Sequence, residues 1–275
     1  MPELDPAILT FYRDRYDEDQ RLIRAPHGRI EFVRTQELLR RHLPTPPATV
    51  LDIGGGTGVH ARWLADDGYQ VHLFDPVPAH VEQAGRFGHF AARVGDARDL
   101  PLPNDSADVA LLLGPLYHLT DAADRQRALA EAIRVTRPGG VVVVAAISRY
   151  AALLELAGLG RLDAAAVHDV TGLLATGINA DDPLGFTVAY FHRPQELAHE
   201  LRHAGLTDVS VVGIEGPSVP ALENASAEMS AAVFDSTLTC ARLVESDPAL
   251  MAASPHLLGV GRVAGAAGRS GTSAS

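Results

Sequence analysis

The chain of 275 residues has one cysteine, Cys240, no long apolar run and no surplus of basic residues. A single cysteine excludes an internal disulfide framework and a cysteine-based zinc ribbon, which suits a reducing compartment. No stretch reaches the roughly twenty apolar residues that cross a bilayer. The segment MPELDPAILT carries acids where a secretory signal needs basic residues. These absences predict a cytoplasmic protein without a membrane-spanning segment.

The formal net charge of −11 argues against a nucleic-acid or anionic-membrane partner, because no basic face is evident. The motifs of several enzyme classes are also missing. The sequence has no G-x-S-x-G elbow, no Walker loop and no Cys–His pair, so hydrolase and ATPase interpretations lack support. Its length and its hydrophobic content of 47% suit one α/β domain with embellishments and a buried core.

From residue 48 the sequence alternates apolar runs of strand type with segments of helical periodicity. Strands are predicted at 48–53, 70–75, 91–95, 107–113, 140–146, 207–214 and 256–263, and helices at 28–43, 58–67, 77–86, 121–135 and in HRPQELAHELRHAG. The run VVVVAA after RPGG is typical of a strand buried on both faces. This rhythm predicts a doubly wound α/β fold with a parallel sheet.

The segments around this core differ in composition from it. We expect a helical N-terminal arm at 1–47, the core at 48–147, a helical lid insertion at 148–193, completion of the core at 194–264 with a helical insertion at 216–253, and a disordered tail at 265–275. The arm and the two insertions are expected to build a substrate pocket over the sheet.

Residues 50–58 read VLDIGGGTG, and the following strand ends in Asp75. A strand that runs into glycines and a helix, with a carboxylate at the next strand end, suits a ribose-bearing cofactor at the carboxyl edge of a sheet. The glycines fit two patterns, G-x-G-x-G starting at Gly54 or the dinucleotide pattern G-x-G-x-x-A from Gly56 to Ala61. The glycines alone do not decide between them.

Five segments together carry a family resemblance: VLDIGGGTG, FDPVP, GDARDLPLP, DVALLLGPLYHL and RVTRPGGVVVVAA. In this order and spacing the chain resembles the class I S-adenosylmethionine-dependent methyltransferases, most of all small-molecule methyltransferases of actinobacterial type. The resemblance implies a Rossmann-like sheet of seven strands with the last strand antiparallel. It also implies methyl transfer from S-adenosylmethionine, which leaves S-adenosylhomocysteine, to an oxygen, nitrogen or carbon of a small, apolar or aromatic metabolite.

The resemblance assigns cofactor contacts by position. Asp75 would hold the ribose hydroxyls, Asp96 would accept from the adenine amino group, and Arg34 would meet the cofactor carboxylate. The other contacts would be Asp52, Gly54, Gly56 and Gly58 at the methionine part, Pro76 and Ala97 at the adenine, and the carbonyls of Leu113 and Gly114 at the ammonium. Two carboxylate acceptors suit a cationic sulfonium ligand. Turn or cap roles for the acids and a solvated helix position for Arg34 are the plainer alternatives.

Methyl transfer requires alignment, exclusion of water and, for some acceptors, removal of a proton. His118 and Tyr117 after the fourth strand and Tyr16 in the arm are the catalytic candidates, and a histidine with its ordinary pKa near 6.5 suits proton removal. A pocket-shaping role for His118 is the alternative. The candidate substrate contacts are Tyr12, Tyr16, Tyr150, Tyr190, His192 and Glu215. The tyrosines equally suit packing of the lid against the body, and Glu215 equally suits a surface loop.

Residues 199–203 match the zinc-protease pattern H-E-x-x-H. On a helical wheel His199 and His203 lie opposite the apolar face that contains Leu201, so we expect a surface coincidence and no metal site. In GPLY, Gly114 replaces the Asn or Asp of the amide-methylating motif, which argues against DNA bases or glutamine amides as acceptors. A nicotinamide-dependent oxidoreductase and a non-catalytic cofactor-binding partner remain as alternatives. The identity of the acceptor, the general base and the choice between monomer and homodimer stay open.

Overall fold

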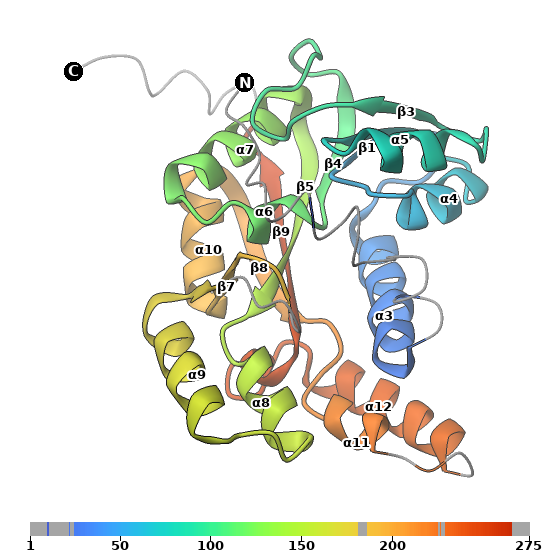
Figure 1. Ribbon diagram of the computed structural model, residues 1–275. Coiled ribbons are helices and arrows are strands. Elements are labelled where there is room, and N and C mark those ends of the chain that lie inside the picture. Colours follow the sequence, from blue (N-terminus) through green and yellow to red (C-terminus); the bar gives the residue numbers. More distant parts are fainter. Residues whose placement is uncertain are drawn as a thin grey trace.

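The computed structural model describes residues 25–180, 186–224, 226 and 229–265, together with the single positions 10 and 22. Residues 1–9, 11–21, 23 and 24 of the expected N-terminal arm and the tail from residue 266 lie outside these described residues. Within the described residues, a central sheet is covered by helices on both faces, and further helices gather at one end (Figure 1).

Seven strands form the core of the sheet in the order β3-β2-β1-β4-β5-β9-β8. Their bounds are Thr49–Ile53 (β1), Gln70–Asp75 (β2), Ala91–Val94 (β3), Ala107–Leu112 (β4), Thr136–Ser148 (β5), Leu206–Gly213 (β8) and His256–Val263 (β9). The strands from β3 to β5 pair in parallel, and β9 runs antiparallel to both β5 and β8. The predicted doubly wound sheet with an antiparallel last strand is confirmed.

Two short strands in the lid insertion were not predicted. Strand β6 (Ile178–Asn179) pairs antiparallel with β7 (Ala189–His192), and β7 continues in parallel along the end of β5. The expectation of a helical lid insertion did not include these two strands. Both strands are too short for an alternating pattern to reveal them, because periodicity needs a longer window.

The valines of β5 alternate between the two faces of the sheet. Val142 and Val144 belong to one buried cluster, and Val141 and Val143 belong to the other. Successive side chains of a strand point to opposite faces, so an unbroken apolar run requires cover on both. Burying one such valine contributes about 1.5 kcal/mol or more. This pattern confirms that the run is a central strand.

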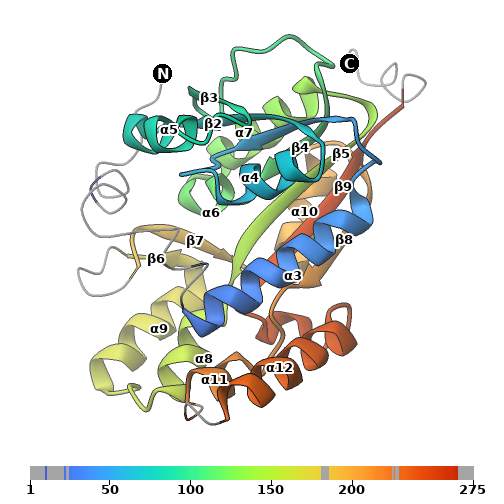
Figure 2. The ribbon, with the colours of Figure 1, turned by 90° about the vertical axis from the view of Figure 1, so that its right-hand side faces the viewer.

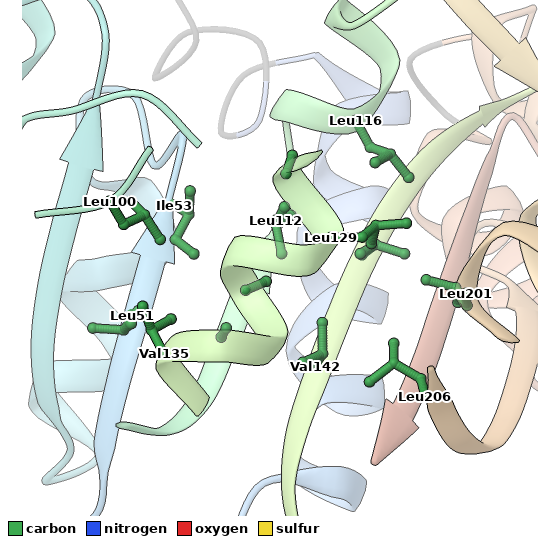
Figure 3. Packing of buried hydrophobic residues seen from close by; sticks show 14 of the residues in the cluster. Leu51, Ile53, Leu100, Leu112, Leu116, Leu129, Val135, Val142, Leu201 and Leu206 are labelled. Atoms are coloured by element: carbon green, nitrogen blue, oxygen red, sulfur yellow. The ribbon is translucent and has the colours of Figure 1, made fainter. Parts of the chain in front are cut away.

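Helices cover both faces. The cluster of Val141 includes side chains from α3, α4 and α5, and the cluster of Val142 includes side chains from α7 and α10, among them Leu129 and Leu201 (Figure 3). The bounds are Pro26–His42 (α3), Val59–Asp66 (α4), Pro78–Gly85 (α5), Ala122–Val135 (α7) and Pro194–His203 (α10). Helix α7 begins at a cap, because the Asp121 side chain accepts from the backbone N–H groups of Ala123 and Asp124.

Four further helices gather beyond the carboxyl end of β5 (Figures 1 and 2). They are Ala151–Gly158 (α8), Ala164–Thr176 (α9), Val219–Glu223 (α11) and Ser230–Val244 (α12). Helix α11 contacts α3, α8 and α12, so the two predicted insertions meet over the same edge of the sheet. None of the described helices is both long and apolar enough to span a bilayer.

Candidate functional site

The loop after β1 is built on glycines in a conformation that other residues rarely adopt. Gly54, Gly56 and Gly58 have φ angles of 69°, 55° and 87°. The backbone N–H of Gly54 donates to the carbonyl of Phe74 on β2 over 2.6 Å, which places the loop over two strand ends. A Cβ on Gly54 would lie 2.4 Å from Cγ of Pro115. The backbone turns sharply at these glycines and comes close to Pro115, as the sequence predicts.

Asp75 ends β2 directly beside this loop and is 4% exposed. Its Oδ2 accepts from the backbone N–H of Gly56 at 2.9 Å, and its Oδ1 accepts from that of Val77 at the same distance. The Nδ1 of His80, in the first turn of α5, lies 3.1 Å from Oδ1. The carboxylate is therefore fixed between the glycine loop and α5, with its edge on the cleft that the loop borders.

Asp52 and Asp96 are the other two buried acids that the sequence singles out. Asp52 lies beneath the glycine loop, because a Cβ on Gly55 would be 2.6 Å from its Oδ2. Asp96 follows β3 and is held by Arg98, whose guanidinium donates to both carboxylate oxygens. Burial raises the pKa of Asp96, but the hydrogen bonds and charge of Arg98 outweigh it and lower that pKa. Asp96 is therefore ionised near neutral pH.

The chain after β4 forms a third wall. Leu113 and Gly114 lead into the short helix α6 (Pro115–His118), which carries Tyr117 and His118 at the cleft. The two rings are 4.6 Å apart, and the ring of His118 stacks on Phe186 with 5.7 Å between centroids. Burial lowers the pKa of His118 to about 4, against smaller opposing effects of a Val188 backbone hydrogen bond and of Asp75. The imidazole is neutral at pH 7, and it is a weak base.

These walls enclose one cleft of about 980 Å³, counting its open mouth, at the carboxyl edge of the parallel strands. Of the predicted cofactor residues, Asp52, Gly54, Gly56, Asp75, Pro76, Asp96, Ala97, Leu113 and Gly114 border it.

The charge of the cleft has one sign. Four carboxylates border it, those of Glu31, Asp52, Asp75 and Asp96, and its described lining includes no Arg or Lys. Bound pyrophosphate would therefore face four carboxylates without a described Arg or Lys to offset them, whereas a sulfonium nucleoside meets the opposite sign. The residues present fit the cationic cofactor better than a dinucleotide.

The structure places several predicted site residues elsewhere. Gly58 caps α4 without bordering the cleft. Arg34 is fully buried, and its guanidinium donates to the Ile214 carbonyl, Glu37 and Glu245. It joins α3 to the end of β8 and to the end of α12, and it does not border the cleft. Tyr12 and Tyr16 lie outside the described residues.

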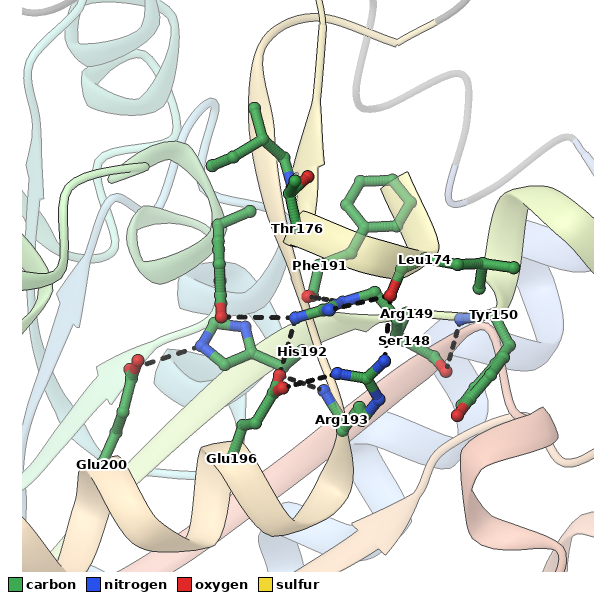
Figure 4. Close-up of polar contacts among 12 residues, drawn as sticks. Ser148, Arg149, Tyr150, Leu174, Thr176, Phe191, His192, Arg193, Glu196 and Glu200 are labelled. Atoms are coloured by element: carbon green, nitrogen blue, oxygen red, sulfur yellow. Dashed lines mark hydrogen bonds and ion pairs between the residues drawn. The ribbon is translucent and has the colours of Figure 1, made fainter. Parts of the chain in front are cut away.

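Tyr150, Tyr190 and His192 do not border the cleft either. They belong to a polar network around Arg149, which is 1% exposed and donates to the carbonyls of Phe191 and Leu174 and to Glu196 (Figure 4). This network joins α9, β7 and α10 behind the lid. The alternative in which tyrosines pack the lid against the body fits these positions better than substrate contact.

Figure 4 also shows the ring of His192 beside Glu200. The separation is 3.3 Å, and Glu200 forms a two-point ion pair with Arg125. Burial raises the pKa of Glu200, but hydrogen bonds from His192 and Arg125 outweigh it and lower that pKa to about 2. Burial lowers the pKa of His192 more than Glu200 raises it.

His199 and His203, by contrast, are exposed on the outer face of α10, and Leu197 and Leu201 are buried on the inner face. The glutamate of the H-E-x-x-H pattern thus points away from its histidines, toward Arg125. The predicted surface position of the two histidines is confirmed.

Glu215 lies directly after β8 and is 2% exposed, so it is not a surface loop charge. Its partners are Ser254 and His256.

Sequence reasoning missed three side chains that border the cleft, namely Glu31 on α3, His60 on α4 and His80 on α5. The signal for His80 was its place in the first turn of a helix that follows a strand-end acid. No sequence signal showed which face of α3 meets the cleft.

Comparison with known proteins gives one family model, described as a methyltransferase domain, which matches residues 51–144. A ubiquinone/menaquinone biosynthesis C-methyltransferase of Acidiphilium cryptum is 30% identical over 182 residues, 63% of this chain and 72% of that protein. An uncharacterized methyltransferase of Mycobacterium tuberculosis is 36% identical over 99 residues, 36% of this chain and 39% of that protein.

Among solved structures, a methyltransferase of Thermotoga maritima described as a possible histamine N-methyltransferase superposes with a TM-score of 0.59 at 20% identity. The match covers 92% of this chain and 98% of that one. At this identity the likeness establishes the fold alone. The matched family segment, residues 51–144, contains the glycine loop, the strand-end acids and α6, which are the parts that build the cleft.

Proposed function

The chain belongs to the class I S-adenosylmethionine-dependent methyltransferases, and from that premise we propose that its cleft passes the donor's methyl group to a small, apolar aromatic acceptor. The donor supplies a methyl carbon that is activated by positive sulfur. The observation that carries the proposal is the lining of the cleft, with four carboxylates, no described Arg or Lys, and apolar side chains such as Val59 and Leu119 between them.

Asp75 and Asp96 are proposed to hold the nucleoside. Each has hydrogen bonds that fix it before a ligand arrives, Asp75 from Gly56 and Val77, and Asp96 from Arg98. A carboxylate oxygen accepts two hydrogen bonds. Oδ2 of Asp75 accepts one from Gly56, which leaves a lone pair for a ribose hydroxyl. Each oxygen of Asp96 accepts two from Arg98, so the adenine amino group would replace one of these bonds. Preorganised acceptors of this kind bind without an added cost of ordering.

The acceptor is proposed to enter beside Tyr117 and His118, on the side of the cleft bordered by Leu22 and Glu31. Aromatic walls suit a flat, apolar ring. The relative from Acidiphilium cryptum, a quinone-pathway C-methyltransferase by name, supports an aromatic acceptor methylated at carbon. Since the lowered pKa of His118 makes it a weak base, we propose that its ring shapes the pocket and orients the acceptor.

Binding of S-adenosylhomocysteine and of NADH, measured by calorimetry on the full chain, tests the cofactor. We expect S-adenosylhomocysteine to bind, and we expect no binding of NADH. The variant Asp75→Asn keeps an oxygen for the Gly56 N–H but loses the charge, so we expect a loss of affinity of roughly tenfold or more with an unchanged fold. The exposed Asp66→Asn is the matched control. Equal affinities in all three proteins would contradict the ribose role.

Turnover with a labelled methyl donor then tests the acceptor. A panel of hydroxylated naphthalenes, simple phenols and aromatic amines, with product carbon and heteroatom methylation separated by mass spectrometry, covers the proposed class. Label in a ring carbon of a hydroxylated aromatic is the expected result. Cofactor binding without turnover on any member, and turnover on an aliphatic amine instead, would contradict the proposed acceptor.

A further inference from the structure

Three side chains from distant parts of the sequence converge next to the cleft. They are Glu31 on α3, Glu215 directly after β8, and His256 at the start of β9. One oxygen of each carboxylate and one ring nitrogen of the histidine all lie within 4.8 Å of one another. In the part of the chain that the structure describes, no second group of three such side chains comes as close.

Glu215 is fixed by a hydroxyl, a backbone N–H and an imidazole. Its Oε2 accepts from the Ser254 hydroxyl at 2.9 Å and from the backbone N–H of His256 at 3.0 Å, and its Oε1 faces Nδ1 of His256 in a short hydrogen bond. Ser254 is held in turn, since its Oγ accepts from the backbone N–H groups of Glu215 and Gly216. Outer hydrogen bonds of this kind orient the carboxylates of metal sites.

Glu215 also meets no Arg or Lys among the described residues. A buried carboxylate usually has a cationic partner, because desolvation of an isolated charge is costly. Here the titratable groups that face it are a histidine and, through that histidine, a second carboxylate: Oε2 of Glu31 lies 3.8 Å from Nδ1 of His256. The arrangement concentrates negative charge around one imidazole.

Arg34 holds Glu31 in place against this pair. It lies one turn after Glu31 on α3, and its Nε donates to the carbonyl of Ile214, the residue directly before Glu215. Its other nitrogens donate to Glu37 and Glu245, so the guanidinium holds α3 against the end of α12. The separation between Glu31 and Glu215 is therefore set by a fully buried clamp.

We propose that Glu31, Glu215 and His256 bind a divalent transition-metal ion, with Mn²⁺ and Zn²⁺ as the matching class. Two carboxylates and one imidazole suit such ions better than Ca²⁺, which takes oxygen ligands alone, or a structural zinc site rich in cysteine. Metal–ligand distances are about 2.0–2.2 Å, so a side-chain movement of about 1 Å closes the three atoms around an ion. The ion takes the place of the hydrogen bond between Glu215 and Nδ1 of His256.

The ion would face the cleft on one side. Glu31 borders the cleft, whereas Glu215 and His256 lie behind it. Coordination positions that the protein leaves open would then point toward the acceptor, where an oxygen such as a phenolate is the matching ligand. This last step rests on the proposed function, but binding of the ion itself does not.

Calorimetric titration of chelator-treated full-length protein with MnCl₂ and with ZnCl₂ tests the site without cofactor or acceptor. One saturable ion per chain is expected, weakened roughly tenfold or more in Glu31→Gln and in His256→Gln. Proton release, measured as a dependence of the heat on buffer ionisation, is expected for the wild type, because the ligands must be deprotonated. Glu31 is the decisive position, since its side chain is 13% exposed and truncation of its charge leaves the buried Glu215 network in place.

The double variant His199→Ala, His203→Ala is the matched control, because an exposed pair of histidines one turn apart also attracts metal ions. Binding that survives in Glu31→Gln and His256→Gln but disappears in the double variant would overturn the proposal, and so would the absence of saturable binding. Thermal unfolding of each variant shows whether it is folded. S-adenosylhomocysteine binding in the same preparations separates failure of the metal site from failure of the cofactor assignment.

Discussion

The low pKa of His118 predicts a specific loss of stability in mild acid. In the unfolded chain its pKa is near 6.5, and in the folded protein burial holds it at about 4. Between these two values the unfolded state binds a proton that the folded state does not. His118 therefore destabilises the fold progressively as the pH falls through this window, by about 3 kcal/mol once the pH is below both values.

The variant His118→Asn removes this titration and keeps a side chain that can donate to the Val188 backbone. From pH 7.5 to pH 5.0 the wild type is expected to lose about 2 kcal/mol more of its free energy of unfolding than the variant does. Other acid-sensitive groups, His192 and Glu200 among them, are present in both proteins and cancel in the difference.

Urea unfolding at both pH values measures the effect, with the fluorescence of the single tryptophan, Trp63, as the signal. Trp63 is buried on α4 with the Arg40 guanidinium over its ring, so its environment changes when that face of the sheet unfolds. Equal denaturant slopes in the two proteins show that the same transition is compared. Equal losses of stability would refute the reasoning, because His118 would then protonate in the folded protein at its ordinary pKa.

Three further predictions concern the backbone, the lid and the surface. Gly54→Ala places a Cβ 2.4 Å from Pro115 at a φ of 69°. We therefore expect calorimetry to detect no cofactor binding and thermal unfolding to show a lower midpoint. The Cβ of Gly85→Ala meets open space, so this control should change neither cofactor binding nor the unfolding midpoint. Arg149→Met removes the donor to the buried Phe191 carbonyl, while Glu196 keeps its ion pair with Arg193, so we expect a cost of about 1–3 kcal/mol. We also expect faster proteolysis between α8 and α9 than in Arg161→Met. His199→Ala with His203→Ala should leave methyl transfer intact, and a large loss that zinc restores would contradict the surface assignment.

The cofactor half of the cleft was predictable because it is local in sequence. Each of these strands carries the group that borders the cleft at its carboxyl end or shortly after it, as Asp75 ends β2 and Gly114 follows β4. Hydrophobic periodicity locates the strands, and the order of parallel strands brings their ends together. Position along the chain therefore places these residues at the cleft, and the family resemblance assigned them to the cofactor.

The other side was not predictable, because its contacts depend on how distant segments dock. Arg34 lies on an amphipathic helix. Nothing in the sequence of that helix shows that its guanidinium donates to the carbonyl of Ile214, which is 180 residues away along the chain. Tyr190 packs between the guanidinium groups of Arg125 and Arg149 for the same reason. Periodicity shows that a face is buried but not which segment covers it, so these residues were assigned to a substrate pocket that they do not border.

The acceptor side of the cleft can change without the cofactor side, because different segments of the chain hold them. Glu31 is positioned by α3, and α3 is bound through Arg34 and Arg41 to Glu245 and through Glu37 to Arg242. Both partners belong to the end of α12, in the insertion that follows β8. A change in the length or packing of that insertion moves the helix that carries Glu31. The glycine loop, Asp75 and Asp96 keep their contacts with one another and with the residues that follow β2 and β3. Substitutions at the α3–α12 interface, such as Glu37→Gln, should therefore change acceptor selectivity and leave the affinity for S-adenosylhomocysteine unchanged. If acceptor selectivity and cofactor affinity are lost together, the two halves of the cleft do not move independently.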